Sequence, residues 1–426
     1  VEELRGNAEE GFGALERALA VAEEADHKPG IALCLNNLGV ILNRRGRYES
    51  ALEHFKRARE IARAIGEASL EGGAVNNLGN VYYDMGRLDL AKESYEAAIK
   101  SQRHSRSQEA LVCYLGNLGL VYLELGEFGK SKSALEEAVF LFSKGGNRFG
   151  EAVMLSNLGD VYLELGRYGK GIELYRRALS IYGELDVPDA NAEALGNLGF
   201  ACSRIGEHGP ADEAFREAHK LLAGVEEPLT LGQVLVKEAL HLADADSVKR
   251  ALTVARRALG VFKKMRQQNR MTYCQSLLAW LHGRTGEKEK ARKAAEKAEA
   301  GLEKMPETLG RLKCRLNMGA ALRMLGESRK AFAHLRSAYG GFHRVNAVPA
   351  AARSLEELGR LAVEVEDYPA AAAYLGAALE ALENMDADPK VRERIVADLE
   401  TSRGIITEKG LGTVVFDAEE PPELGG

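Results

Sequence analysis

The chain has 426 residues, of which 46% are hydrophobic and 28% charged, with ten prolines, five cysteines and a formal net charge of -6. No apolar run approaches the ~18 residues that a membrane-spanning helix needs, and no charged-then-apolar leader stands at the beginning, so we expect a cytoplasmic protein and no membrane partner. The cysteines lie far apart in sequence, which argues against disulfides and a metal site.

The sequence repeats with a period of forty residues. The triplet Asn-Leu-Gly recurs, with a near copy at 317–319, at 37–39, 77–79, 117–119, 157–159 and 197–199. An alanine column runs without insertion from Ala58 to Ala378 through nine consecutive repeats. A fixed period of this length indicates stacked units rather than separate globular domains.

Each repeat is predicted to be two antiparallel helices, which makes the fold class all-α. In residues 151–190 the apolar positions follow helical spacing up to a turn at Gly166, and a second apolar stripe starts near Gly169. Gly166 belongs to a column at which a left-handed residue ends the first helix. A second glycine column, at Gly39 and Gly159 for example, lies inside the first helix, where we expect the second helix to cross closely.

These columns resemble tetratricopeptide repeats. The resemblance is carried by Leu38, Gly39, Tyr82, Tyr122, Tyr162, Ala51, Ala91, Phe55, Tyr95, Tyr175 and the alanine column. The forty-residue form is similar to the repeats of Leu-Gly-Asn (Pins-type) adaptors and kinesin light chains, and bacterial signalling proteins use similar arrays. The resemblance covers about residues 1–400. It implies that the chain folds as a right-handed α-α superhelical solenoid. We expect the protein to be a bacterial regulatory relative of these families.

The period divides the chain into six predicted regions. They are a second helix of a truncated repeat (1–30), five regular repeats (31–230), a degenerate repeat (231–270), three further repeats (271–390), a capping helix (391–409) and a disordered acidic tail (410–426). The degenerate repeat is either folded like the others or a bend. Because the chain begins with Val inside a repeat, we expect a fragment whose upstream part covers an apolar stripe with Leu15, Leu19 and Val21.

The asparagine column is the first candidate binding site. The resemblance implies that Asn37, Asn77, Asn117, Asn157 and Asn197 contact a ligand, because a row of amides can pair with the backbone of an extended peptide. The alternative is that these amides only bond neighbouring helices. The triplet is densest in repeats one to five, which favours a groove in the N-terminal half.

Neighbouring positions add selectivity to this predicted groove. A basic or amphipathic peptide would suit the side chains expected beside the asparagines, namely Asn80, Tyr83, Asp84, Glu124, Asp160 and Glu164. Trp280, the single tryptophan, is either a binding hot spot or a packing residue. The alternative for the acidic side chains is that they are ordinary solvated charges.

No pattern of catalytic, phosphate-binding or metal-binding residues occurs, so we expect a chain that is not an enzyme and has no cofactor. Residues 241–350 carry a net charge of +14, but their cations lack interleaved aromatics, and nucleic-acid binding is not favoured. The predicted function is a non-catalytic scaffold that binds a peptide or protein segment in a concave groove. The alternative is the sensor or regulatory arm of a larger signalling enzyme or transcriptional activator. A further hypothesis places the tail in a groove of its own or a neighbouring molecule.

Overall fold

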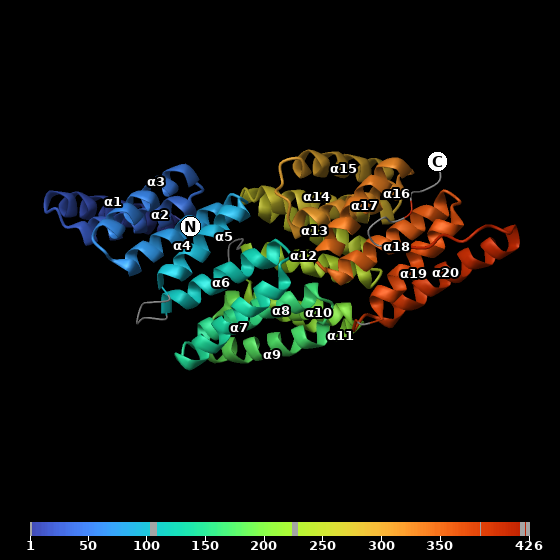
Figure 1. Ribbon diagram of the computed structural model, residues 1–426, viewed down its shortest axis with the longest axis horizontal. Helices are drawn as coiled ribbons and strands as arrows, with labels where there is room; N and C mark the ends of the chain where they lie inside the picture. Colours follow the sequence, from blue (N-terminus) through green and yellow to red (C-terminus); the bar gives the residue numbers. More distant parts are fainter. Residues whose placement is uncertain (1, 103–108, 224–228, 384, 418–421, 423–426) are drawn as a thin grey trace. The chain divides into compact units, whose positions relative to one another are not determined.

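The protein is built from α-helices alone in the part of the chain that the structure describes (Figure 1). The computed structural model describes residues 2–102, 109–223, 229–383, 385–417 and 422. Within these ranges it contains twenty helices, and none of them is long and apolar enough to cross a membrane. The prediction of an all-α fold of antiparallel helix pairs is confirmed.

The helices alternate along the chain as first and second helices of the repeats. The first helices are α2 (Lys28–Arg44), α4 (Ala68–Asp84), α6 (Glu109–Glu124), α8 (Arg148–Glu164), α10 (Pro188–Arg204), α12 (Leu229–Asp244), α14 (Gln268–Arg284), α16 (Leu309–Met324) and α18 (Val348–Glu364). The second helices are α3 (Tyr48–Ala64), α5 (Leu88–Gln102), α7 (Phe128–Lys144), α9 (Tyr168–Leu185), α11 (His208–Leu221), α13 (Val248–Lys264), α15 (Lys288–Leu302), α17 (Ser328–Arg344) and α19 (Tyr368–Leu382). Two helices flank these pairs, α1 (Glu2–Glu24) and α20 (Pro389–Lys409).

The glycine column inside the first helices marks close helix crossings, as the sequence predicts. A Cβ atom on Gly159 would lie 2.6 Å from the ring of Tyr175 in α9, and one on Gly79 would lie 2.6 Å from Tyr95 in α5. The side chain sixteen positions further on therefore fills the space that each glycine leaves empty. This packing offsets the loss of helix propensity that an internal glycine causes.

The turns between helices recur at half the expected period. A residue with a left-handed backbone, with φ between 47° and 83°, occurs in most repeats at two positions twenty residues apart. The first position includes Gly166 and the second includes Gly146 and Asp186. The turn survives even where glycine is absent, because Asp246 and Glu366 adopt φ values of 55° and 62°.

The degenerate repeat is a packed helix pair, α12 and α13. Its Ala239 replaces the internal glycine, and the facing residue of α13 is the small Ala255 instead of an aromatic or leucine; both alanines are fully buried. Repeat seven makes the same exchange with Ala279 and Ala295. A larger side chain on one helix is thus matched by a smaller one on its partner. The helix crossing is preserved without the glycine.

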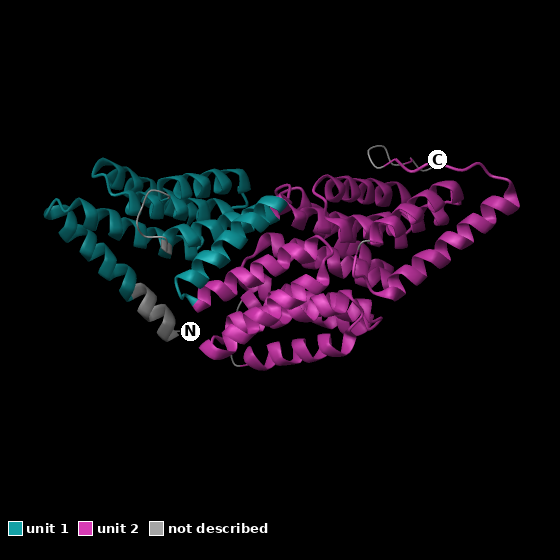
Figure 2. Cartoon of the chain, turned by 60° about the horizontal axis from the view of Figure 1, so that its bottom comes forward, with its two compact units in different colours: residues 1–123, 129–147 teal, residues 124–128, 148–426 magenta. Residues whose placement is uncertain are grey.

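The chain forms two compact units (Figure 2). Unit 1 consists of residues 1–123 and 129–147, and unit 2 of residues 124–128 and 148–426. The boundary therefore falls within repeat three and directly before α8, and not at the degenerate repeat. There α12 and α13 share one buried apolar cluster with residues of α14 and α16, which joins repeat six to the repeats that follow.

Unit 2 contains contacts between turns that are far apart in the sequence. A Cβ atom on Gly166 would lie 2.9 Å from the side chain of Met385, and one on Gly206 would lie 3.0 Å from Asp388. The backbone N–H of Asp388 donates a 3.0 Å hydrogen bond to the carbonyl oxygen of Arg204. The segment before α20 is therefore held against the turns that follow α8 and α10.

The C-terminal helix begins slightly earlier than predicted. Helix α20 begins at Pro389 and not at 391, because Asp388 accepts a 3.0 Å hydrogen bond from the Lys390 N–H as its N-cap. In the segment predicted to be a disordered tail, residues 410–415 and 417 are exposed and Phe416 is half-buried. The ring of Phe416 packs at 5.9 Å from Tyr339 and 6.1 Å from Tyr374. Residues 418–421 and 423–426 of that tail lie outside the described residues.

At the other end, α1 packs on α2 within unit 1. Of the predicted exposed stripe, Leu15 and Leu19 are half-buried, and Leu19 contacts the apolar cluster around Leu35. Val21 is 65% exposed, as the sequence predicts. The difference arises because Leu15 and Leu19 lie on the side of α1 that faces the repeat.

Candidate functional site

The asparagines of unit 1 form a hydrogen-bonded network across three repeats. The Asn77 amide donates to Asn36 Oδ1 at 2.9 Å, and the Asn117 amide donates to Asn76 Oδ1 at 3.0 Å. Asn80 joins them, because its amide donates to Asn77 Oδ1 at 3.1 Å. The column that the resemblance implies for ligand contact thus connects α2, α4 and α6.

The other asparagines of the column differ in accessibility. Asn37 on α2 is exposed, and Asn157 on α8 is half-buried. Asn197 is 2% exposed, and its amide oxygen accepts a hydrogen bond from Lys237 of α12. Asn317 donates to the Ser276 hydroxyl at 3.3 Å. Structural bonding between repeats is therefore present at most of the column, and Asn37 is the member most open to solvent.

Two further predicted residues of unit 1 lie at the end of α4. The Asp84 carboxylate accepts a 2.8 Å hydrogen bond from the Asn43 amide of α2, which links the first helices of repeats one and two. Tyr83 is half-buried beside it. Both side chains are thus near the end of the asparagine network, on the same helix as Asn77 and Asn80.

The predicted acidic residues of unit 2 meet cations from the same chain. Lys313 of α16 forms a 2.5 Å ion pair with Glu164 of α8. The Asp160 carboxylate accepts a 2.6 Å hydrogen bond from the hydroxyl of Tyr175. Burial raises the pKa of Glu124, and the charge of Lys313 opposes this rise. The acidic side chains that suggest a basic ligand in the sequence are therefore partly neutralised from within.

The charges of this cluster act on one another. Burial raises the pKa of Asp160, and the charge of Lys237 and the hydrogen bond from Tyr175 oppose it. Burial alone would lower the pKa of Lys313, but the carboxylates of Glu164 and Glu124 raise it overall. The ammonium group is therefore held in its charged form between two carboxylates.

A cavity of about 400 Å³ opens in unit 2 beside Trp280. Most of its wall comes from the first helices α10, α12, α14, α16 and α18 and from the start of α20, and Tyr168 of α9, Leu382 of α19 and the segment before α20 complete it. Trp280 is 7% exposed and belongs to the buried cluster of repeats six to eight. The guanidinium carbons of Arg353 and Arg284 lie 4.5 Å and 5.4 Å from its ring centroid. Trp280 thus both packs in the core and lines the cavity.

Seven cationic side chains and four carboxylates line this cavity. Most of these charges are paired: Arg323 with Glu357 at 3.0 Å, and Arg394 with Glu356 at 2.6 Å. The two glutamates are 4% exposed. The cavity therefore has fixed, largely internal ion pairs, and Arg284, Arg323 and Arg360 also pair with acids outside its lining.

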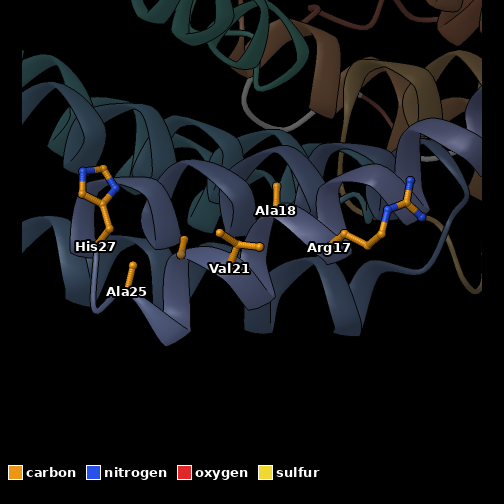
Figure 3. Close-up of a pocket in the computed structure, with 6 residues that line it drawn as sticks. Arg17, Ala18, Val21, Ala25 and His27 are labelled. Carbon is orange, nitrogen blue, oxygen red and sulfur yellow. The ribbon is translucent and has the colours of Figure 1, made fainter.

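A second, shallow pocket lies on α1 in unit 1 (Figure 3). It is lined by Arg17, Ala18, Val21, Ala22, Ala25 and His27. Its small apolar side chains offer few groups that could orient a ligand. Among the described residues, no group of three or more His, Cys, Asp or Glu side chains could hold a metal ion.

Several residues of these sites are not predicted by the sequence pattern. Asn36 and Asn76 complete the network in unit 1, and the doubled Asn-Asn of repeats one and two is the signal that could have found them. Lys313 lies in the basic segment, yet nothing in its local sequence indicates that it faces Glu164. Arg353 joins Trp280 across 73 positions, a distance in sequence at which no helical spacing predicts contact.

The chain is similar to known repeat proteins. A family model described as tetratricopeptide repeat matches residues 1–64, 72–142 and 150–223. No curated protein matches the chain. The crystal structure of aspartyl phosphate phosphatase F from Bacillus subtilis is similar with a TM-score of 0.53 at 13% identity, over 66% of this chain and 73% of that one.

Two further solved structures have the same fold. The apo form of the quorum sensor NprR from B. thuringiensis has a TM-score of 0.53 at 15% identity, over 70% of this chain and 84% of that one. The apo form of RapI has a TM-score of 0.50 at 13% identity, over 65% of this chain and 98% of that one. At these identities the likeness concerns the fold alone.

Proposed function

The chain carries tetratricopeptide repeats, and from this premise we propose that it is a non-catalytic scaffold that binds a peptide or protein segment in the cavity beside Trp280. One observation carries the proposal: most of the cavity wall comes from the first helices of five consecutive repeats. A surface built from several repeats can contact successive residues of an extended segment. Trp280 supplies a rigid aromatic anchor of the kind that dominates binding energy.

The asparagine column contributes differently from what the sequence suggests. The amides of Asn77, Asn117 and Asn197 are engaged with neighbouring helices, so Asn37 and Asn157 are the members that we propose for ligand contact. Each amide offers a donor and an acceptor to a peptide backbone. The contacts at Asn37 in unit 1 and at Asn157 in unit 2 are separate from one another, and both are secondary to the cavity.

One neighbour with a solved structure is described as a quorum sensor. The proposal takes from it only that this fold occurs in a protein that senses a signal. Binding at the cavity would serve equally in a scaffold and in the regulatory arm of a larger signalling protein.

The test uses the single tryptophan as its own reporter. Peptides selected from a random displayed library on the purified chain are synthesised and titrated, while the emission of Trp280 and the anisotropy of a labelled peptide are recorded. A peptide bound in the cavity should change the Trp280 emission. Trp280→Phe should weaken the peptide by at least about tenfold, since anchors of this kind are worth ~2 kcal/mol or more.

Phe140→Ala is the matched control. Phe140 is 64% exposed on α7 in unit 1, so its removal should leave the peptide affinity unchanged. Because Trp280 also packs in the core, circular dichroism must show that the Trp280→Phe variant is folded. Selected peptides that bind without changing the emission, and bind Trp280→Phe equally well, would reject the cavity as the site.

A further inference from the structure

The guanidinium of Arg353 lies over the indole ring of Trp280, with its central carbon 4.5 Å from the ring centroid. Arg353 belongs to α18 and Trp280 to α14, so two repeats create the pair. A guanidinium stacked on an aromatic face keeps its N–H groups directed outward along its own plane. The stack therefore holds a cation at the cavity wall without consuming its hydrogen-bond donors.

Arg353 differs from the other arginines of the cavity lining because no described residue forms an ion pair or a hydrogen bond with it, and its Nη2 atom is buried without an acceptor. Arg323, by contrast, pairs with Glu357 at 3.0 Å. Arg284 donates to Asp246 at 2.8 Å and to the Ala243 carbonyl oxygen at 2.7 Å. Buried donors in folded proteins nearly always have acceptors, and Arg353 keeps donors that the described residues of the chain do not use.

The surroundings of Arg353 favour an anion as the partner of these donors. Five of the seven cations that line the cavity form ion pairs, and three of these also pair with acids outside the lining, namely Asp246, Glu364 and Asp398. Burial lowers the pKa of Arg284, Asp246 and Asp244 oppose this, and the charges of Arg353 and Arg394 lower it further. Among the described residues, Arg353 and Lys390 are therefore the lining cations without an ion-paired acid. A carboxylate would balance them and match the planar donors of arginine.

We infer that the cavity recognises an acidic peptide segment, with Arg353 binding a carboxylate of the segment and Trp280 contacting an adjacent apolar side chain. The inference rests on the proposed function and names the chemical class of its ligand. It reverses the charge that the acidic positions of repeats two to four suggest in the sequence. Those acids have cations of the chain beside them, whereas Arg353 has no acid.

The experiment titrates the full chain with synthetic octapeptides of alternating leucine and a variable residue, both ends capped, and follows Trp280 emission. The variable residue is aspartate, asparagine or lysine. A fourth peptide has the asparagine sequence with a free C-terminal carboxylate, which separates a side-chain carboxylate from a terminal one as the source. We expect the aspartate peptide, the free-acid peptide, or both to bind at least about tenfold more tightly than the lysine peptide.

Three variants accompany the titration. Arg353→Gln removes the charge and should weaken the preferred acidic peptide by at least about tenfold, while Arg353→Lys keeps the charge without the planar fork and should be intermediate. Arg257→Gln removes the same charge from an exposed position on α13 and should have no effect. Arg353→Gln also loses the contact with the Trp280 ring, so a small fall of its thermal midpoint without peptide is expected, and circular dichroism must show that the variant is folded.

The outcomes separate the two proposals. Binding of the acidic and lysine peptides with equal affinity, or unchanged binding by Arg353→Gln, would overturn the inference while leaving the proposed function intact. Loss of affinity in Arg257→Gln equal to that in Arg353→Gln would also overturn it, since only net charge would then matter. If no peptide, including those selected from the library, changes the Trp280 emission, both proposals fail.

Discussion

Lys313 of α16 forms an ion pair with Glu164 of α8 across 149 positions of the chain. The pair brings the basic segment of residues 241–350 against an acidic face of repeat four. Part of the positive charge of the basic segment is therefore paired with acidic residues inside unit 2. The charge asymmetry of the sequence does not by itself indicate two different external partners.

Removing the Lys313 charge should destabilise the fold. In Lys313→Gln, Glu124 and Glu164 lose the cation between them, which costs several kcal/mol for a fully buried pair. The Lys313 side chain is 35% exposed, so solvent screening reduces the expected loss to about 1–3 kcal/mol. Urea unfolding of the variant measures it, with Lys293→Gln, an exposed position on α15, as the control.

The loss in Lys313→Gln should depend on pH. Glu124 and Asp160 have raised pKa values in the folded chain, so between the unfolded and folded pKa values they bind more protons when folded. The free energy of unfolding therefore falls as pH rises through that window. Lys313 lowers the pKa of Glu124, so its removal extends the window upward. We expect a larger loss near pH 8 than near pH 5; an equal loss at both would contradict this account.

A methyl group in the glycine column should strain the helix crossing. Gly159→Ala places a Cβ atom 2.6 Å from the Tyr175 ring, and we expect a net loss of about 1–3 kcal/mol despite the better helix propensity of alanine. Gly260→Ala is the control on α13, where a Cβ atom meets nothing within 4 Å, and should instead gain up to about 1 kcal/mol. Chemical unfolding of both variants compares them.

Repeats six and seven supply a test of the same crossing. There the pairs Ala239 with Ala255 and Ala279 with Ala295 replace a glycine that faces a large residue. The double variant Gly159→Ala and Tyr175→Ala should be more stable than the sum of the two single losses predicts. A coupling free energy below about 0.5 kcal/mol in this double-mutant cycle would show that the residues do not compensate for one another.

Measurements of stability alone can show which asparagines of the column contribute to the fold. Asn117→Ala leaves the Asn76 oxygen without that donor and should cost about 1 kcal/mol. Asn37→Ala, at an exposed position of the same column, should change the free energy of unfolding by less than about 0.5 kcal/mol. A comparable loss in both would mean that accessibility does not distinguish the two positions.

The turn at Glu366 should improve when glycine replaces it. Glu366 adopts φ of 62°, a left-handed conformation that costs a residue with a Cβ atom roughly 1–2 kcal/mol. Glu366→Gly relieves this strain but adds flexibility to the unfolded chain, so a net gain of about 0.5–1 kcal/mol is expected. Glu366→Ala removes the same carboxylate without the conformational freedom. A thermal midpoint as high as that of the glycine variant would show that the charge, and not the backbone, is responsible.

The forty-residue period predicts the structural features that depend only on residues of the same repeat. The helix pairs, the turn glycines and the close crossing at Gly159 follow from side chains within a single repeat. The pairing of Lys313 with Glu164 and of Arg353 with Trp280 depends on how several repeats turn relative to one another. Small rotations accumulate from repeat to repeat, and no local pattern encodes their sum.

The asparagine column also shows what residue spacing cannot predict. Its spacing correctly indicates a row of amides at equivalent positions, but spacing does not tell whether an amide is already bonded. The amide of Asn77 donates to Asn36, and that of Asn117 donates to Asn76. Asn36 and Asn76 each lie one position before the asparagine of the column in their repeat. The basic ligand predicted from Asp160 and Glu164 has the same weakness, since their cations lie in distant repeats.

The contacts of Gly166 with Met385 and of Gly206 with Asp388 place a restriction on how unit 2 could change in length. An array held only by nearest neighbours tolerates the gain or loss of a unit anywhere, because each repeat is stabilised by the two beside it. In unit 2 the turns after α8 and α10 also rest on the segment before α20, and this match requires the present number of repeats between them. Excision of one forty-residue unit would remove more than that unit's own stability, so unit 2 should unfold as a single cooperative block.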